Sequence, residues 1–179
     1  MQDWVKDLKK SAQAFEAIKH TVMPKIISGT IVSIETTDNE VLGWLDKHSG
    51  IDLLRKDAHG LQGIAWRAQW GHAYDSFTIR LERHTGAKTE FEKRIEAIEK
   101  GYFYPAFTVQ AYFDKADANN CLSIGAIRTI DLYEVYKNQP RVFRQRKSDN
   151  TFLFVDWDRL PGLVKVWRSQ QGQLDIFQV

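Results

Sequence analysis

Cysteine is almost absent from this chain of 179 residues, and its scarcity excludes several kinds of site. Cys121 is the single cysteine, so neither an internal disulfide nor a cysteine-based zinc site can form within one copy. A reducing, cytoplasmic location fits this composition. A lone cysteine is more often a small buried apolar residue than a nucleophile, and we expect Cys121 to be buried.

Long apolar runs and a large net charge are also missing. No stretch approaches the ~18 consecutive apolar residues that a membrane span needs. The opening residues MQDWVKDLKK carry charges where a secretion signal has its apolar centre, so we expect no membrane span and no secretion signal. The net charge of +2 permits nucleic acid as a partner without requiring it.

Aromatic residues are abundant, with 6 Trp, 10 Phe and 6 Tyr. Such side chains fill a core or, when exposed, stack on bases. With 43% hydrophobic and 27% charged residues, the chain is most simply one globular domain. We place the centre of that domain at about residues 30–138 and treat an N-terminal helix (3–20) and a C-terminal hairpin region (141–168) as additions.

Helical periodicity and capping signals predict several helices. Thr37 with Glu40, and Thr89 with Glu92, have the spacing of a capping box, and Gly50 stands where a helix would end. The expected helices cover residues 3–20, 37–49, 89–100 and 131–138.

Short apolar runs between turn residues predict strands. The segments 51–57, 63–70 and 76–83 follow one another closely, which favours an antiparallel meander. Further strands are expected at 25–35, 107–113, 121–130, 141–147, 151–157 and 163–167, the pair at 141–157 forming a hairpin. The order predicts a mixed α/β domain in which a helical crossover leads from the meander to a later strand.

Polar residues interrupt the first and second strands of this meander. In GIAWRAQW the period of two places Ile64, Trp66, Ala68 and Trp70 on one face. Arg67 and Gln69 share the other face, and Asp52 lies across from them if the two strands pair. Oxygen atoms of Asp52, of Gln69 and of Glu40 on the preceding helix suit a hard divalent cation. Arg67 suits a phosphate, which a guanidinium binds with two parallel hydrogen bonds.

Here the sequence resembles the PD-(D/E)XK nuclease superfamily over about residues 38–130. Asp52, which follows a helix and SG, matches the family's first acid. The family's next strand carries an acid or glutamine two residues before a lysine. Here WRAQW has the basic residue, Arg67, before Gln69, and it has no lysine. The resemblance implies a restriction-endonuclease-like fold and a nuclease that binds DNA and hydrolyses phosphodiesters with Mg²⁺ or Mn²⁺. It implies metal ligation by Asp52, with Glu40 or Gln69, and a stabilising role for Arg67, which as a guanidinium is a poor base.

Two alternatives stay open beside that reading. The chain can be a catalytically inactive nuclease-like module that binds nucleic acid or a protein, and a homodimer is compatible with either function. Each residue also has a structural explanation: Asp52 can pair with Arg55, and Arg67 and Gln69 can form the solvent face of a sheet.

Basic residues form two groups along the chain. Basic side chains on strands suit phosphate contacts, although charged edge strands also protect sheets from aggregation. The residues expected to contact DNA are Arg80, Arg83 and Lys88 in the first group and Arg141, Arg144, Arg146 and Lys147 in the second. The five histidines are scattered without metal-ligand spacing, and no GxxxxGK[ST] loop is present.

Overall fold

The computed structural model describes residues 3–34, 39–117, 119–148 and 150–170. Its elements are α1 (Asp3–Ile18), α2 (Met23–Ile26), β1 (Thr30–Ser33), α3 (Glu40–Ser49), β2 (Leu53–Asp57), β3 (Gly60–Trp70), β4 (Ser76–Glu82), α4 (Glu90–Glu99), β5 (Pro105–Phe113), β6 (Cys121–Arg128), α5 (Thr129–Asn138), β7 (Arg144–Lys147), β8 (Thr151–Asp156) and β9 (Lys165–Arg168). No helix in these ranges is long and apolar enough to cross a membrane.

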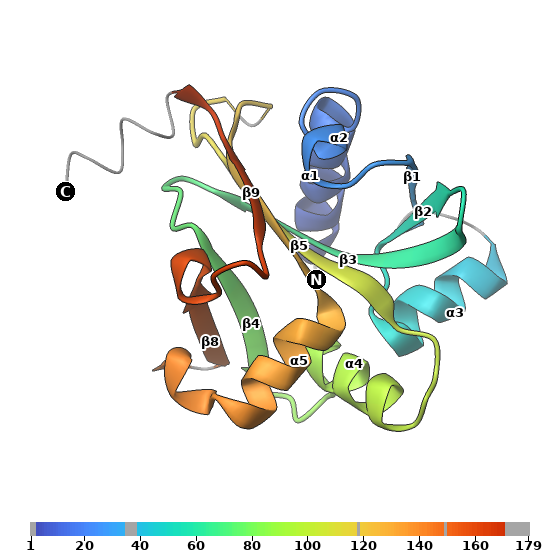
Figure 1. Ribbon diagram of the computed structural model, residues 1–179, viewed down its shortest axis with the longest axis vertical. Coiled ribbons are helices and arrows are strands. Elements are labelled where there is room, and N and C mark those ends of the chain that lie inside the picture. The colour runs from blue at the N-terminus through green and yellow to red at the C-terminus, as the bar shows by residue number, and fades with distance from the viewer. Residues whose placement is uncertain (1–2, 35–38, 118, 149, 171–179) are drawn as a thin grey trace.

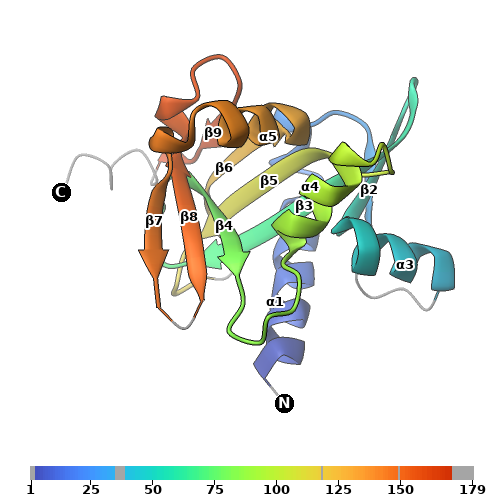
Figure 2. The same ribbon diagram turned by 90° about the horizontal axis from the view of Figure 1, so that it is seen from below.

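The strands form two sheets, which confirms the mixed α/β class. The main sheet has six strands in the order β1-β2-β3-β5-β6-β9, and the small sheet has three in the order β4-β8-β7. Only the β3–β5 pair is parallel among the strand pairs of the described residues. Helices α1 and α2 lie above the main sheet in Figure 1, and α4 and α5 lie below it. The small sheet stands to one side, with its strands running in a different direction from β3 and β5 (Figure 2).

The predicted meander of 51–57, 63–70 and 76–83 is wrong in its third strand. β2 and β3 do pair antiparallel, with Leu53 opposite Ile64. β4 instead joins the small sheet, where Ser76 pairs with Asp156 of β8. The chain turns away after β3 through Gly71, at φ 117°, and β5 takes the free edge of β3 in parallel. The antiparallel meander therefore consists of β1, β2 and β3.

Helix ends follow local side-chain chemistry. Helix α3 begins at Glu40 and is capped by Asn39, whose Oδ1 accepts hydrogen bonds from two backbone N–H groups. The capping box predicted for Thr37 and Glu40 is thus replaced by a different cap, and Thr37 lies outside the described residues. Gly50 ends α3 in the left-handed conformation, at φ 62°. The capping box of Thr89 and Glu92 at the start of α4 is confirmed.

The C-terminal hairpin is confirmed, and β8 also pairs with β4. Its first strand begins at Arg144 and not at Arg141, because Pro140–Val142 form a 3₁₀ turn that proline favours at its first position. The last strand, β9, returns to the edge of the main sheet beside β6.

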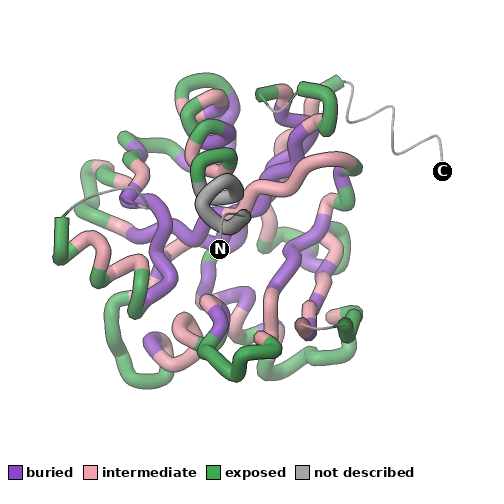
Figure 3. The backbone as a smooth tube through the Cα atoms, turned by 180° about the vertical axis from the view of Figure 1, so that it is seen from behind, coloured by how far each residue is buried: buried purple, intermediate pink, exposed green. Residues whose placement is uncertain are grey.

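Apolar side chains gather on both sides of the main sheet. One cluster lies under α1 and α2 and includes Phe15, Ile64 and Trp66. The second lies between the main sheet, the small sheet, α4 and α5, and includes Phe77 and Tyr112. Buried residues, purple in Figure 3, are accordingly concentrated in inner strands such as β5 and β6. Cys121 is buried, as expected from the sequence.

Candidate functional site

Asp52 is an acid held inside the protein between α3 and β2. Its residue is 9% exposed. One carboxylate oxygen, Oδ2, accepts a hydrogen bond of 2.6 Å from the backbone N–H of Trp66 and lies 4.0 Å from the guanidinium of Arg94. The buried carboxyl group therefore has one backbone donor and one cationic neighbour, and the alternative pairing with Arg55 is not found: Arg55 pairs with Asp57.

Burial controls the protonation of this pair. Burial raises the pKa of Asp52 to about 7, although Arg94 and the Trp66 N–H favour its charged form. Burial also lowers the pKa of Arg94, opposed by Asp52. Near neutral pH, Asp52 is therefore present in both its protonated and its ionised form.

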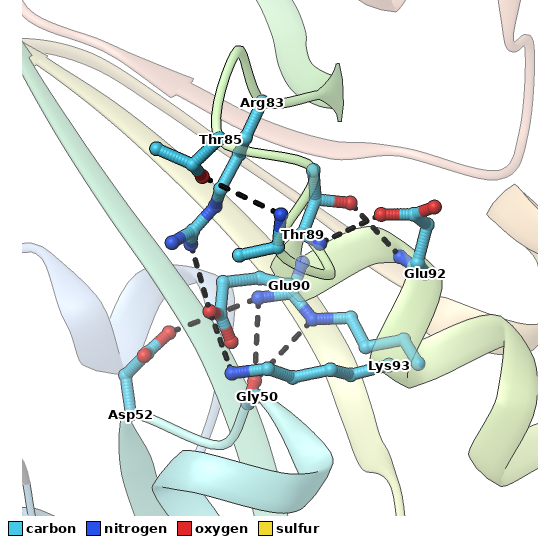
Figure 4. A network of polar contacts seen from close by, with 10 residues as sticks. Gly50, Asp52, Arg83, Thr85, Thr89, Glu90, Glu92 and Lys93 are labelled. Atoms are coloured by element: carbon cyan, nitrogen blue, oxygen red, sulfur yellow. Dashed lines mark hydrogen bonds and ion pairs between the residues drawn. The ribbon is translucent and has the colours of Figure 1, made fainter.

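A polar network joins this acid to α4 (Figure 4). Arg94 donates to the backbone oxygen of Gly50 from Nε at 3.3 Å and from its terminal nitrogen at 3.2 Å. Glu90 accepts from Arg83 at 3.2 Å and from Lys93 at 2.8 Å. The network fixes the start of β2, the end of β4 and the first turns of α4 relative to one another.

A cavity of about 150 Å³ lies beside this network, between the main sheet, β4 and α4. We call it the arginine cavity. Four arginines and two acids line it, together with neutral side chains. The charged residues are Arg67, Arg80, Arg83, Arg94, Asp52 and Glu90. Because Asp52 is only partly ionised near neutral pH, positive charge predominates in the cavity.

Arg67 and Arg80 make no ion pair with an acid among the described residues. The Arg67 side chain projects from β3 and is half-buried. Burial and the neighbouring charge of Arg80 lower its pKa to about 10. Both guanidinium groups lie near the ring of Phe152, at 5.9 Å for Arg67 and 5.4 Å for Arg80. The buried Nε of Arg80 has no hydrogen-bond partner within the described chain.

A second hollow, of about 630 Å³, adjoins the first. We call it the aromatic groove. Arg67 and Thr78 line both hollows. The groove is lined by Arg67, Gln69, Tyr74, Ser76, Thr78, Arg144, Gln145, Arg146, Ser148, Phe152 and Phe154.

The predicted site residues are brought together in part. Asp52 and Arg67 line the arginine cavity, and Gln69 lies in the adjoining groove on the same side of the main sheet. The Gln69 side-chain oxygen accepts hydrogen bonds from Gln110 at 3.0 Å and from Thr78 at 3.4 Å. This oxygen is therefore already occupied by protein donors.

Glu40 does not join this group. It is exposed at the first position of α3, whereas Asp52 follows the last residue of that ten-residue helix. A helix of this length separates its ends by about 15 Å. Glu40 lines neither hollow, and the described residues contain no group of three His, Cys, Asp or Glu side chains that could hold a metal ion. The predicted ligand set of Asp52, Glu40 and Gln69 does not converge.

The predicted basic residues divide between the hollows and the surface. Arg80 and Arg83 line the arginine cavity, and Arg144 and Arg146 line the aromatic groove. Three others lie outside both linings: Lys88, which pairs with Glu96, and the exposed Arg141 and Lys147. Arg144 forms an ion pair with Asp156, whereas Arg146 has no ion pair among the described residues.

Sequence reasoning did not assign site roles to Glu90, Arg94 or Gln110. Arg94 had a usable signal, because it lies three positions after Phe91 and three before Ala97, the buried residues of α4. An arginine on the buried stripe of a helix needs an acid or a ligand. Gln110 gave a weaker signal as the single amide within the apolar strand β5.

Comparison with known protein families and with curated proteins finds no match for this chain. Its function is therefore argued from the geometry of the two hollows.

Proposed function

We propose that the protein binds DNA through phosphate groups held in the arginine cavity and the aromatic groove, as a nuclease-like binding module. The observation that carries the proposal is Arg67: a half-buried guanidinium that lines both hollows and has no acidic partner in the described chain. Arginine holds phosphate through two parallel hydrogen bonds, which gives both charge and orientation.

A half-buried cation without an acidic partner destabilises the protein when no ligand is bound. Removing a guanidinium from water is costly unless an anion compensates it. Arg67 lies close to Arg80, whose like charge adds to the cost and contributes to the lowered pKa of Arg67. A bound phosphodiester would relieve both costs at once. The site is therefore better suited to a ligand anion than to the stability of the fold.

Metal-dependent cleavage, which the family resemblance implies, stays a prediction. The proposed donors do not fit one ion as placed, because Glu40 is remote and the Gln69 oxygen accepts from two protein donors. We therefore derive no catalytic step through a metal. Arg67 keeps its proton near neutral pH even with a pKa of about 10, so it stabilises charge and does not act as a base.

Binding is tested with fluorescently labelled DNA titrated at several salt concentrations. Arg67→Met should weaken binding about tenfold or more and lower the log–log salt slope by about one, since one phosphate contact is lost. Lys165→Met, at an exposed cationic residue outside both hollows, is the control and should leave the affinity within twofold. Unchanged binding by Arg67→Met, or no binding by the native protein, would contradict the proposal.

Cleavage is tested by incubating plasmid DNA with the protein and Mg²⁺ or Mn²⁺. Nicking that is lost in Asp52→Asn would establish the metal-dependent nuclease. Binding without nicking by the native protein would instead assign the chain to the inactive, nuclease-like class.

A further inference from the structure

The small sheet presents aromatic rings beside arginines on the face that lines the groove. Across β4, β8 and β7, Arg80 pairs with Phe152, which pairs with Arg146. The neighbouring row is formed by Thr78, Phe154 and Arg144. Residues directly opposite one another in a sheet project to the same face. On this surface Phe152 is thus flanked by an arginine on each side, and Phe154 by an arginine on one side.

The two phenylalanines differ in how far their rings are already engaged. The Phe152 ring lies near the guanidinium groups of Arg67 and Arg80. Phe154 is half-buried, and its ring centre lies 6.4 Å from that of Phe152. Among the described residues no cation lies over the Phe154 ring. Tyr74, on the loop between β3 and β4, lines the same groove and is 65% exposed. Phe154 and Tyr74 are therefore the rings with surface left for a ligand.

These contacts suit a nucleic acid whose bases are unpaired. A protein ring can stack on a base only where a neighbouring base does not cover it, and a duplex covers the bases of its interior. The groove volume of about 630 Å³ lies within the range of sites that enclose small ligands, about 300–1,000 Å³. It holds a group of nucleotide size rather than a duplex.

We infer that the aromatic groove takes single-stranded nucleic acid, with one unpaired base stacked against Phe154 and Tyr74 and the adjoining phosphates held by Arg67 and Arg146. This inference rests on the proposed function and names the class of nucleic acid that the same site selects. The rings supply preference for an unpaired base, and the arginines supply contacts to the backbone.

The experiment compares three labelled ligands of equal length: a single-stranded oligothymidylate, the corresponding duplex, and a single strand whose central nucleotides are abasic. The native protein should bind the oligothymidylate about tenfold more tightly than either of the others. Equal affinity for all three would overturn the inference while leaving phosphate binding intact. Binding to none of them would overturn the proposed function itself.

Variants locate the stacked base. Phe154→Leu and Tyr74→Ala should each lose about tenfold in affinity for the oligothymidylate and keep their affinity for the abasic strand. Tyr74 is exposed, so its replacement tests the inference even if Phe154→Leu folds poorly. Phe103→Leu, at an exposed aromatic outside the groove, is the control and should not change binding. An equal loss of affinity for the abasic strand would contradict stacking and would show that the two rings only position the neighbouring arginines.

A free nucleoside monophosphate carries the same base and phosphate as a strand. Competition by thymidine monophosphate as strong, per molecule, as competition by unlabelled oligothymidylate would overturn the inference in favour of a free nucleotide. Competition at least a hundredfold weaker would support a strand held at more than one phosphate.

Discussion

The two faces of β3 differ in how completely the protein itself satisfies them. On one face, Ile64 and Trp66 are buried beneath α1, and the Trp66 indole N–H donates to Ser11 at 3.1 Å. On the other, Arg67 is partly buried beside Arg80 with no acid paired to it in the described chain. The first face is explained by folding alone, whereas under the proposed function the second is completed by a bound phosphate. Substitutions on the two faces should accordingly have opposite effects.

The largest effect is expected on the apolar face. Phe15 on α1 is fully buried and packs edge-on against Trp66, with ring centres 5.9 Å apart. Phe15→Ala should lower the free energy of unfolding by about 3–5 kcal/mol, because it removes buried area and leaves a cavity. Urea denaturation measures this, with Phe103→Ala as an exposed control. A loss below about 1 kcal/mol would show that α1 contributes little to the fold.

Through Asp52, the free energy of unfolding should depend on pH. The pKa of Asp52 rises from 3.8 to about 7 on burial, so the folded state binds more protons than the unfolded state between those values. The free energy of unfolding should therefore fall as pH rises from about 4 to about 7. Each pKa unit corresponds to about 1.4 kcal/mol, and we expect a loss of about 2 kcal/mol or more relative to Asp52→Asn.

Parallel denaturation series of the native protein and Asp52→Asn at several pH values measure this difference. The Asn variant keeps an acceptor for the Trp66 N–H but does not titrate. Curves that stay parallel from pH 4 to pH 7 would contradict the raised pKa.

A stabilising change is expected at Arg67. Arg67→Met keeps much of the side-chain volume but removes a poorly compensated charge, so the free energy of unfolding should rise by about 1 kcal/mol while DNA affinity falls. Thermal and urea denaturation measure the change, with Arg141→Met as the control. A loss of stability would mean that Arg67 serves the fold, and the contrast between the two faces of β3 would disappear.

The smallest effect on folding is expected in the hairpin. Replacing Arg144 and Arg146 together by Gln should lower the free energy of unfolding by less than about 1 kcal/mol, because both arginines are exposed. The same variant should lower the log–log salt slope of DNA binding by about two. The double replacement of Lys100 and Lys165 by Gln, two exposed lysines outside both hollows, is the control. An unchanged slope would assign the two arginines to edge protection.

Local patterns in the sequence predicted much of this fold. The period of two in GIAWRAQW separates Trp66 from Arg67 as expected, and the capping box at Thr89 marks the start of α4. The partner of β4 could not be predicted in the same way, because β4 and β8 are far apart in the chain. Short strands of similar composition do not specify which distant edge they will join.

The site was predictable to a similar degree. Asp52 and Arg67 line the same cavity because the antiparallel pairing of β2 and β3 brings them together. The short turn between the two strands predicted this pairing. Glu40 was predicted to join the site because it is near Asp52 in the sequence. Helix α3 lies between the two residues and keeps them apart. Arg80 and Arg83 line the same cavity as Arg67 because β4 belongs to the small sheet and not to the predicted meander.

The pairing of β4 with β8 also sets an order of events during synthesis. β2 and β3, and likewise β5 and β6, are neighbours in the chain and can pair as soon as they are made. At roughly 5–20 residues per second, β4 emerges several seconds before β8, its single partner strand among the described residues. A free strand edge is a template for pairing with other chains. The nascent protein is therefore exposed to aggregation through β4 until the aromatic groove is completed.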